Sequence, residues 1–185
     1  MAGTLITDFL QASANAITVL NATGGTIFSA NTAGLYNQSG QIISTSTVNG
    51  ALANVTINGI QELDNIAATS ATGTINFDLL TQSVLYYTTN ASGNFTLNFR
   101  GNGSQTFNNT VPVGASVSAT FLNTNGSTAY YNSAVTIDGA SVSPKWQGGT
   151  APTTGNASAI DSYNYVIIKT GNAAYTVLAS QTKFA

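Results

Sequence analysis

The sequence predicts an all-β protein, with an antiparallel β-sandwich (jelly-roll-like) C-terminal domain and an extended, strand-rich N-terminal anchoring segment. Short runs of β-branched and aromatic residues recur along the chain between Gly and Asn turns, which is typical of sandwiches and barrels. Alternation is clearest where Phe95, Leu97 and Phe99 are interleaved with polar residues. We therefore expect an N-terminal segment at 1–72 and a β-sandwich domain at 73–185.

The expected strands of the C-terminal domain each combine a short apolar run with turn residues on both sides. They are 74–77, 84–89, 95–100, 117–124, 129–137, 142–146, 163–170 and 175–182. The residues 90–93 predict a hairpin between the second and third of these strands, and Gly171-Asn172 predicts the turn between the last two. Residues 163–168 are apolar on both faces, which indicates a central strand or one that a partner chain covers.

The segment 1–72 lacks the pattern of an independent domain. Residues 16–20, 26–31 and 41–48 are strand candidates, and 49–72 alternates so weakly that we interpret it as a connector packing against neighbouring chains. A stretch so short and interrupted cannot bury its own apolar residues. We therefore expect this segment to dock the protein on a larger particle through scattered hydrophobic side chains. These are Leu5, Phe9, Leu10, Ile27 and Phe28.

The composition excludes several classes of function. Charged residues make up only 5% of the chain, against about 25% in an ordinary soluble domain. The chain has no Cys and no His, which excludes zinc clusters, disulfides and Ser-His or Cys-His catalysis. No basic cluster is present to neutralise nucleic-acid phosphates, and no apolar run is long enough to insert into a membrane. We expect no cofactor.

Sparse charge also bears on association and on pH. A net charge of −2 gives weak protection against self-association, so we interpret the chain as a subunit of an assembly. With six acidic residues and no His, few groups can couple folding to protonation. We expect stability to be nearly constant from mildly acidic to mildly basic pH.

Aromatic residues are the candidates for a ligand or subunit contact. Trp146, the only Trp, could be a platform for sugar stacking, but we favour a core or interface anchor because Trp buries a large area. The pairs Tyr86-Tyr87 and Tyr130-Tyr131 should place one ring on each face of a sheet. The outward ring of each pair would suit a subunit interface.

The acidic residues offer weaker candidates. Asp138, beside Gly139, and Asp161 could bind calcium, but calcium usually needs several carboxylates, so we expect both to be turn residues that cap the backbone. Glu62 and Asp64 are the only close acidic pair, whereas a glycosidase needs two carboxylates across a cleft. The sequence therefore predicts no metal site and no enzyme.

Several uncommon strings in the second half resemble tail-fibre and other structural proteins of marine tailed phages, notably cyanophages. In order they are QSVLYYTTN (82–90), NFTLNFRG (94–101), AYY (129–131), VTIDG (135–139), PKWQGGTAP (144–152) and ASQTKF (179–184). The resemblance covers about residues 73–185, and the opening MAGTL is also similar to the start of such fibre proteins.

This resemblance implies a protein of the virion surface, made in the host cytoplasm and in contact with other virion proteins. By analogy with phage fibres we expect a homotrimer. A tail fibre, a capsid fibre and a capsid-decoration subunit all remain open, as does a host-recognition module that binds a surface glycan.

Overall fold

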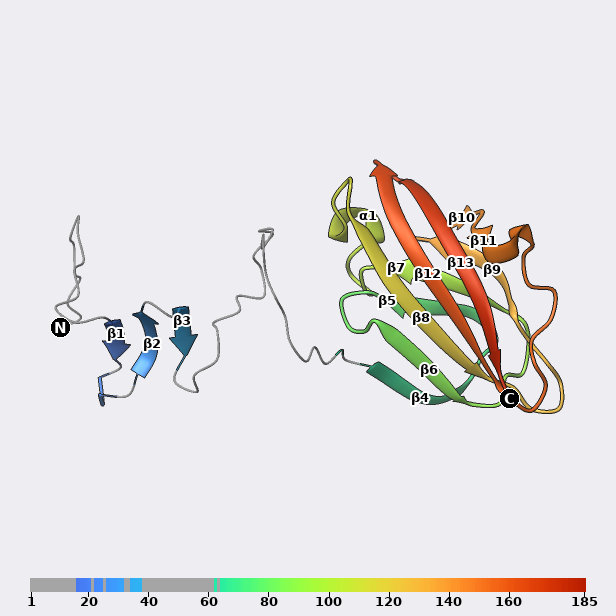
Figure 1. Cartoon of the computed structure of the whole chain (residues 1–185), viewed down its shortest axis with the longest axis horizontal. Coiled ribbons are helices and arrows are strands. Elements are labelled where there is room, and N and C mark those ends of the chain that lie inside the picture. The colour runs from blue at the N-terminus through green and yellow to red at the C-terminus, as the bar shows by residue number, and fades with distance from the viewer. Residues whose placement is uncertain (1–15, 21, 25, 32–33, 38–61, 63) are drawn as a thin grey trace. The chain divides into compact units, whose positions relative to one another are not determined.

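The computed structural model describes residues 16–20, 22–24, 26–31, 34–37, 62 and 64–185. The chain divides into two compact units, Met1–Thr56 and Ile57–Ala185 (Figure 1). The described residues lie predominantly in strands, so the predicted all-β class is confirmed. The second unit begins before residue 73, where the sequence analysis placed the start of the C-terminal domain.

The described residues of the first unit form a small antiparallel sheet, in the order β1 (Ala16–Leu20), β2 (Thr26–Asn31) and β3 (Gly34–Asn37). The strands predicted at 16–20 and 26–31 are confirmed with those bounds, whereas β3 was not predicted. The strand predicted at 41–48 lies outside the described residues.

The second unit is built from two sheets. A six-stranded sheet has the order β11-β13-β12-β8-β6-β4, and a four-stranded sheet has the order β10-β9-β7-β5. The strands of the larger sheet are β4 (Asp64–Ser70), β6 (Val84–Thr89), β8 (Ser116–Thr124), β11 (Lys145–Trp146), β12 (Ile160–Gly171) and β13 (Ala174–Phe184). Those of the smaller sheet are β5 (Gly73–Asp78), β7 (Phe95–Arg100), β9 (Asn132–Ile137) and β10 (Ala140–Val142).

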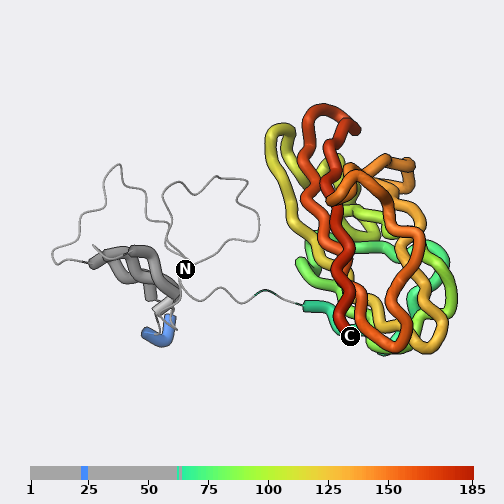
Figure 2. Tube along the Cα trace, turned by 45° about the vertical axis from the view of Figure 1, so that its right-hand side comes forward, coloured from blue at the N-terminus to red at the C-terminus, as the bar shows by residue number. Residues whose placement is uncertain are grey.

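From β4 to β9 the chain forms a coil that alternates between the two sheets, which can be followed along the tube in Figure 2. Within the larger sheet β4 is parallel to β6 and β6 is parallel to β8, and within the smaller sheet β5, β7 and β9 are likewise parallel. Each turn of the coil therefore adds one strand to each sheet. This part of the molecule has three such turns, β4–β5, β6–β7 and β8–β9.

The corners of the coil stack on one another through backbone hydrogen bonds. At the β6–β7 corner, Ala91 N donates to Thr124 O at 2.8 Å, and Ser92 N donates to Ala71 O at 3.0 Å. Ala71 and Ala91 are both buried at these corners. Because their side chains are small, successive corners can approach each other closely. These contacts hold the coil in register.

The parallel pairs correct the prediction of an antiparallel, jelly-roll-like sandwich, since jelly rolls are antiparallel architectures. They also show that the hairpin predicted at 90–93 was wrong, because β6 and β7 lie in different sheets. Turn residues between two strands are compatible with a hairpin and with a corner that crosses between sheets. The local sequence does not distinguish the two.

Among the described residues of the second unit, every antiparallel pair includes at least one strand that follows the coil, namely β10, β12 or β13. β12 pairs antiparallel with β8 on one side and with β13 on the other. The turn predicted at Gly171-Asn172 does join β12 to β13, but its two residues are Asn172 and Ala173, and Gly171 pairs with Ala174. β9 and β10 form a hairpin through Asp138 (φ 51°) and Gly139 (φ 80°), both in the left-handed region that a two-residue Asp-Gly turn requires. The strand predicted at 142–146 is divided between β10 and β11, which lie in different sheets.

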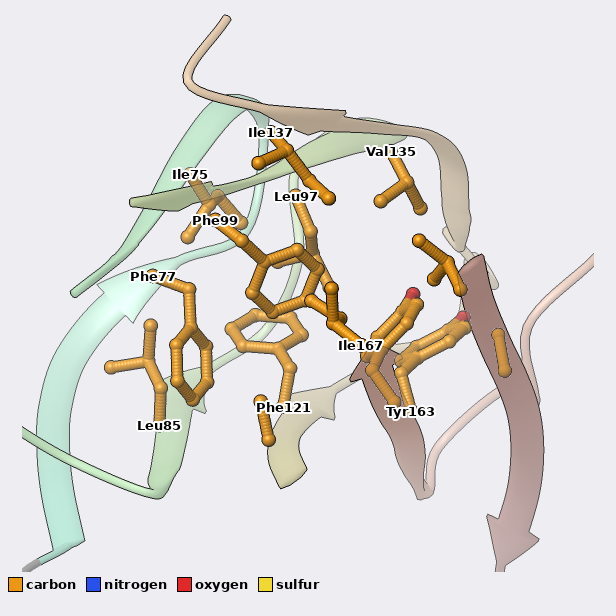
Figure 3. Packing of buried hydrophobic residues seen from close by; sticks show 14 of the residues in the cluster. Ile75, Phe77, Leu85, Leu97, Phe99, Phe121, Val135, Ile137, Tyr163 and Ile167 are labelled. Atoms are coloured by element: carbon orange, nitrogen blue, oxygen red, sulfur yellow. The ribbon is translucent and has the colours of Figure 1, made fainter. Parts of the chain in front are cut away.

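A core of aromatic and aliphatic side chains lies between the two sheets (Figure 3). The Phe95 ring is 5.2 Å from Phe121 and 5.7 Å from Tyr163, edge to face in both cases, so β7 packs against β8 and β12. The Phe99 ring lies 4.9 Å from Tyr165. Figure 3 shows Leu97 and Ile137 among the side chains from the smaller sheet that point toward this layer. Such contacts between rings stabilise the core in addition to the free energy gained by burying their apolar area.

The short helix α1 (Phe107–Thr110) is held by charged side chains at both ends. The carboxylate of Asp138 accepts hydrogen bonds from Phe107 N (2.7 Å) and Asn108 N (3.0 Å). The buried Lys169 donates through Nζ to the carbonyl oxygens of Asn108 and Val111. Lys169 thus satisfies backbone acceptors that the end of a helix leaves unpaired.

Candidate functional site

Trp146 packs at the rim of the core. It lies on the short edge strand β11, partly buried, with its ring 6.0 Å from that of Tyr165 at a steep angle. This placement agrees with the interpretation of Trp146 as an anchor. One side of the residue also borders an open hollow of about 450 Å³, with Lys145, Gln147 and Asn164 among its lining residues.

The two tyrosine pairs behave differently. Tyr87 faces inward, with its ring 5.3 Å from Phe121, while Tyr86 occupies the opposite face of β6 and its hydroxyl accepts a hydrogen bond from Thr124 Oγ1 (3.4 Å). One ring therefore lies on each face, as predicted. Tyr130 and Tyr131 precede β9 and both pack against the core, so the same prediction was wrong for this pair, because alternation applies only within a strand.

The predicted anchoring residues belong to the first unit. Leu5, Phe9 and Leu10 lie outside the described residues. Ile27 and Phe28 are in β2, where the backbone of Phe28 is paired with Val19 on one side and with Asn37 on the other.

The acidic residues that the structure describes are spread over different parts of the second unit. Glu62 accepts a hydrogen bond from Ser83 Oγ (2.6 Å), and Asp64 is exposed at the start of β4. Asp138 caps α1 from a turn, as predicted for a turn residue. Asp161 does not lie in a turn but is fully buried on β12, which corrects that prediction. Among the described residues no three His, Cys, Asp or Glu side chains come together as a metal site would require.

A buried polar cluster surrounds Asp161 and was not predicted. Asn123 and Asn125 are both buried, and Asn125 Nδ2 donates to Asp161 Oδ2 at 3.1 Å. Burial raises the pKa of the Asp161 carboxyl, against the opposing effects of a hydrogen bond from Asn156 N and of the charge of Lys183. Asn123 shares the parity of Phe121, so alternation along β8 does indicate that Asn123 faces inward, whereas Asn125 follows the end of the strand.

A second buried polar residue, Asn132, joins the two sheets. Its Nδ2 donates to the carbonyl oxygens of Phe95 (3.1 Å) and Ala134 (2.8 Å), and its Oδ1 accepts from the Tyr165 hydroxyl (2.9 Å). Its backbone N donates to the Tyr163 hydroxyl at 3.2 Å. Burial raises the pKa of both tyrosines, so they remain neutral hydrogen-bonding groups inside the domain.

The face of the six-stranded sheet that points away from the core, here called the outer face, carries apolar side chains. Ile66 is 69% exposed, Leu178 is 43% exposed and Val166 is 38% exposed. Val166 and Leu178 are register partners, and Lys145 is the partner of Leu178 on its other side. A sheet face that exposes several large apolar residues is a common place for association.

Within the part of the chain that is described, no helix is long and apolar enough to cross a membrane. No protein-family model, curated protein or solved structure matches this chain.

Proposed function

We propose that this protein is a non-enzymatic structural subunit of a tailed-phage particle, a tail fibre, a capsid fibre or a capsid-decoration subunit. In this proposal the N-terminal segment docks on other virion proteins and the C-terminal domain projects from the particle surface as a β-sandwich. The resemblance of residues 73–185 to phage structural proteins motivates the assignment.

The observation that supports this proposal best is that the second unit has its own core and also an outer face with little charge. Its buried residues, among them Phe99, Phe121 and Tyr165, come from both sheets of that unit. Its described acidic residues serve as caps, ion-pair partners or exposed edge residues, apart from the buried Asp161. Asp78, for example, pairs with Arg100 (2.5 Å). Such a domain is suited to packing and projection more than to chemistry.

A test on purified particles addresses the assignment directly. The four basic residues give trypsin few cleavage sites, whereas eight Phe and eight Tyr give chymotrypsin many, so chymotryptic mass spectrometry is the suitable measurement. We expect peptides of this chain in gradient-purified virions of the encoding phage, at a constant ratio to the major capsid protein across the particle peak. Recovery only from the soluble part of the lysate would contradict a structural role.

We further propose a homotrimer in which the outer face contributes to the contact between copies. Placing carboxylates there, in the double substitution Val166→Asp and Leu178→Asp, should convert the trimer to monomer, because buried unpaired charges are costly. Light scattering coupled to size exclusion at micromolar concentration measures the change in mass.

The matched control is Leu80→Asp with Val113→Asp, which alters two exposed apolar residues (54% and 61%) that lie on loops and not on the outer face. This control should remain trimeric. A wild-type monomer, or a trimer that survives the outer-face substitutions, would contradict the proposed contact.

The second candidate is a host-recognition module that binds a surface glycan, and the hollow beside Trp146 favours it. Aromatic rings stack on sugars, and the polar residues Gln147 and Asn164 line the same hollow as Trp146. Because Trp146 is the only Trp, a change in its fluorescence on adding host surface oligosaccharide would distinguish this candidate from a purely structural role.

A further inference from the structure

Two buried oxygen atoms in the second unit have no hydrogen-bond donor among the described residues. They are Asn123 Oδ1 and Asp161 Oδ1. The two residues are direct register partners on the neighbouring strands β8 and β12, and both are completely buried. Partners of this kind point to the same face of the sheet, with their Cβ atoms about 5 Å apart. Burying two neighbouring acceptors without a donor destabilises the folded state, so we expect a donor to lie between them.

The orientation of the Asn123 amide cannot be reversed to supply that donor. Asn123 Nδ2 donates to Asn125 Oδ1 at 3.0 Å, and this same oxygen accepts from Tyr130 N at 3.2 Å. A backbone N–H can only donate, which fixes the orientation of Asn125. Asn125 Nδ2 in turn donates to Tyr130 O and to Asp161 Oδ2. Turning the Asn123 amide would therefore place two acceptor oxygens against each other.

The described donors around Asp161 all donate to the same carboxyl oxygen, Oδ2. Oδ2 accepts from Asn156 N (2.9 Å), Asn125 Nδ2 (3.1 Å) and Gln181 Nε2 (3.4 Å). An ionised carboxylate would place charge on Oδ1 as well, where no described donor receives it. A carboxylic acid with its proton on Oδ1 has Oδ2 as the carbonyl oxygen, which agrees with this distribution.

The ionisable groups near Asp161 are few. Lys183, its register partner on β13, favours the ionised form through its charge but is exposed. Tyr163 lies on the same strand, and Tyr131 is near Tyr163. The partner from β8 is the uncharged Asn123. Burial acts in the direction opposite to Lys183 and raises the pKa of the carboxyl.

We propose that Asp161 is a proton-binding site of the folded domain, with the protonated Oδ1 donating a hydrogen bond to Asn123 Oδ1. One proton then satisfies both unpaired oxygens. A calcium ion would require six to eight oxygen ligands, and this pair offers only two free ones. In the unfolded chain the same carboxyl is exposed to water and ionises near the ordinary value for Asp, about 3.9.

The substitution Asp161→Asn tests this directly in the full chain, since an amide reproduces the donor at Oδ1 and the acceptor at Oδ2. At pH 8, where ionisation of the wild-type carboxyl is most complete, the variant should melt higher by about 2–4 °C. The difference should shrink as the pH falls toward 4, because acid then protonates the wild-type carboxyl. The matched control is Asp138→Asn, which replaces the carboxylate that caps α1 from an exposed turn. At pH 8 the melting temperature of this variant should be lower than that of the wild type.

Nuclear magnetic resonance of the side-chain carboxyl carbon supplies a second readout that does not depend on stability. The Asp161 signal should titrate above the ordinary Asp value of about 3.9. Titration at or below that value, together with an Asp161→Asn variant less stable than wild type at pH 8, would overturn the proposal in favour of a water bridging an ionised carboxylate. A rise in melting temperature with calcium that chelation reverses would overturn it in favour of a bound cation.

Discussion

Replacing Phe121 by Ala should lower the free energy of unfolding of the second unit by about 3–5 kcal/mol. Phe121 is completely buried on β8, and its ring touches Tyr87 from the larger sheet and Phe95 from the smaller one. Truncation removes both ring contacts and leaves a cavity between two sheets that cannot close without losing other contacts. The expected loss is a large part of the stability of an ordinary domain.

Denaturant unfolding followed by Trp146 fluorescence measures this loss, because the only Trp lies in the second unit and reports its unfolding. The neighbouring substitution Leu122→Ala is the matched control, since that side chain points to the outer face and is only partly buried. Its cost should be about 1 kcal/mol. Equal losses for the two variants would show that the core does not lie where the ring contacts place it.

Replacing Asn132 by Leu should destabilise the domain by about 3 kcal/mol although Leu is similar in size and more hydrophobic. The substitution leaves the Tyr165 hydroxyl and the Ala134 carbonyl without the partners they have now. The Phe95 carbonyl keeps a hydrogen bond from Ser133 Oγ (3.3 Å), which limits the loss.

A double-mutant cycle with Tyr165→Phe separates these contributions. Removing the hydroxyl from the Asn132→Leu variant deletes the unpaired group, so the double variant should be more stable than the sum of the single losses predicts, by about 1 kcal/mol or more. Unfolding is measured by the same fluorescence change. Strict additivity would mean that the hydrogen bond between Tyr165 and Asn132 contributes nothing.

Local alternation was enough to predict most strands of the second unit. The strands at 84–89 and 95–100 have the predicted bounds, because alternating apolar residues and flanking turns are properties of short segments. β4 was interpreted as a connector because its exposed edge position leaves few apolar residues to alternate. Pairing between strands depends on residues far apart in sequence, so the coil was not predicted.

The candidate residues show the same division. The inward position of Tyr87 and the outward position of Tyr86 follow from strand parity. By contrast, residue type alone does not distinguish Asn132 from the many other Asn residues of the chain. It does not identify Asp161 as buried either, because Asp was expected in turns. What identifies them is burial and the partners that surround them, which arise only when the sheets come together.

The coiled arrangement of β4 to β9 also has a consequence for the order in which the domain assembles. Each turn of the coil can add to the preceding one as the chain lengthens, since its strands pair with those already formed. Tyr163 and Tyr165, however, come from β12, after all three turns. Until β12 joins β8, the rings of Phe95 and Phe99 lack these partners, so the apolar layer stays accessible to chaperones or to other chains. Synthesis of β12 and β13 is therefore the step that ends this exposure.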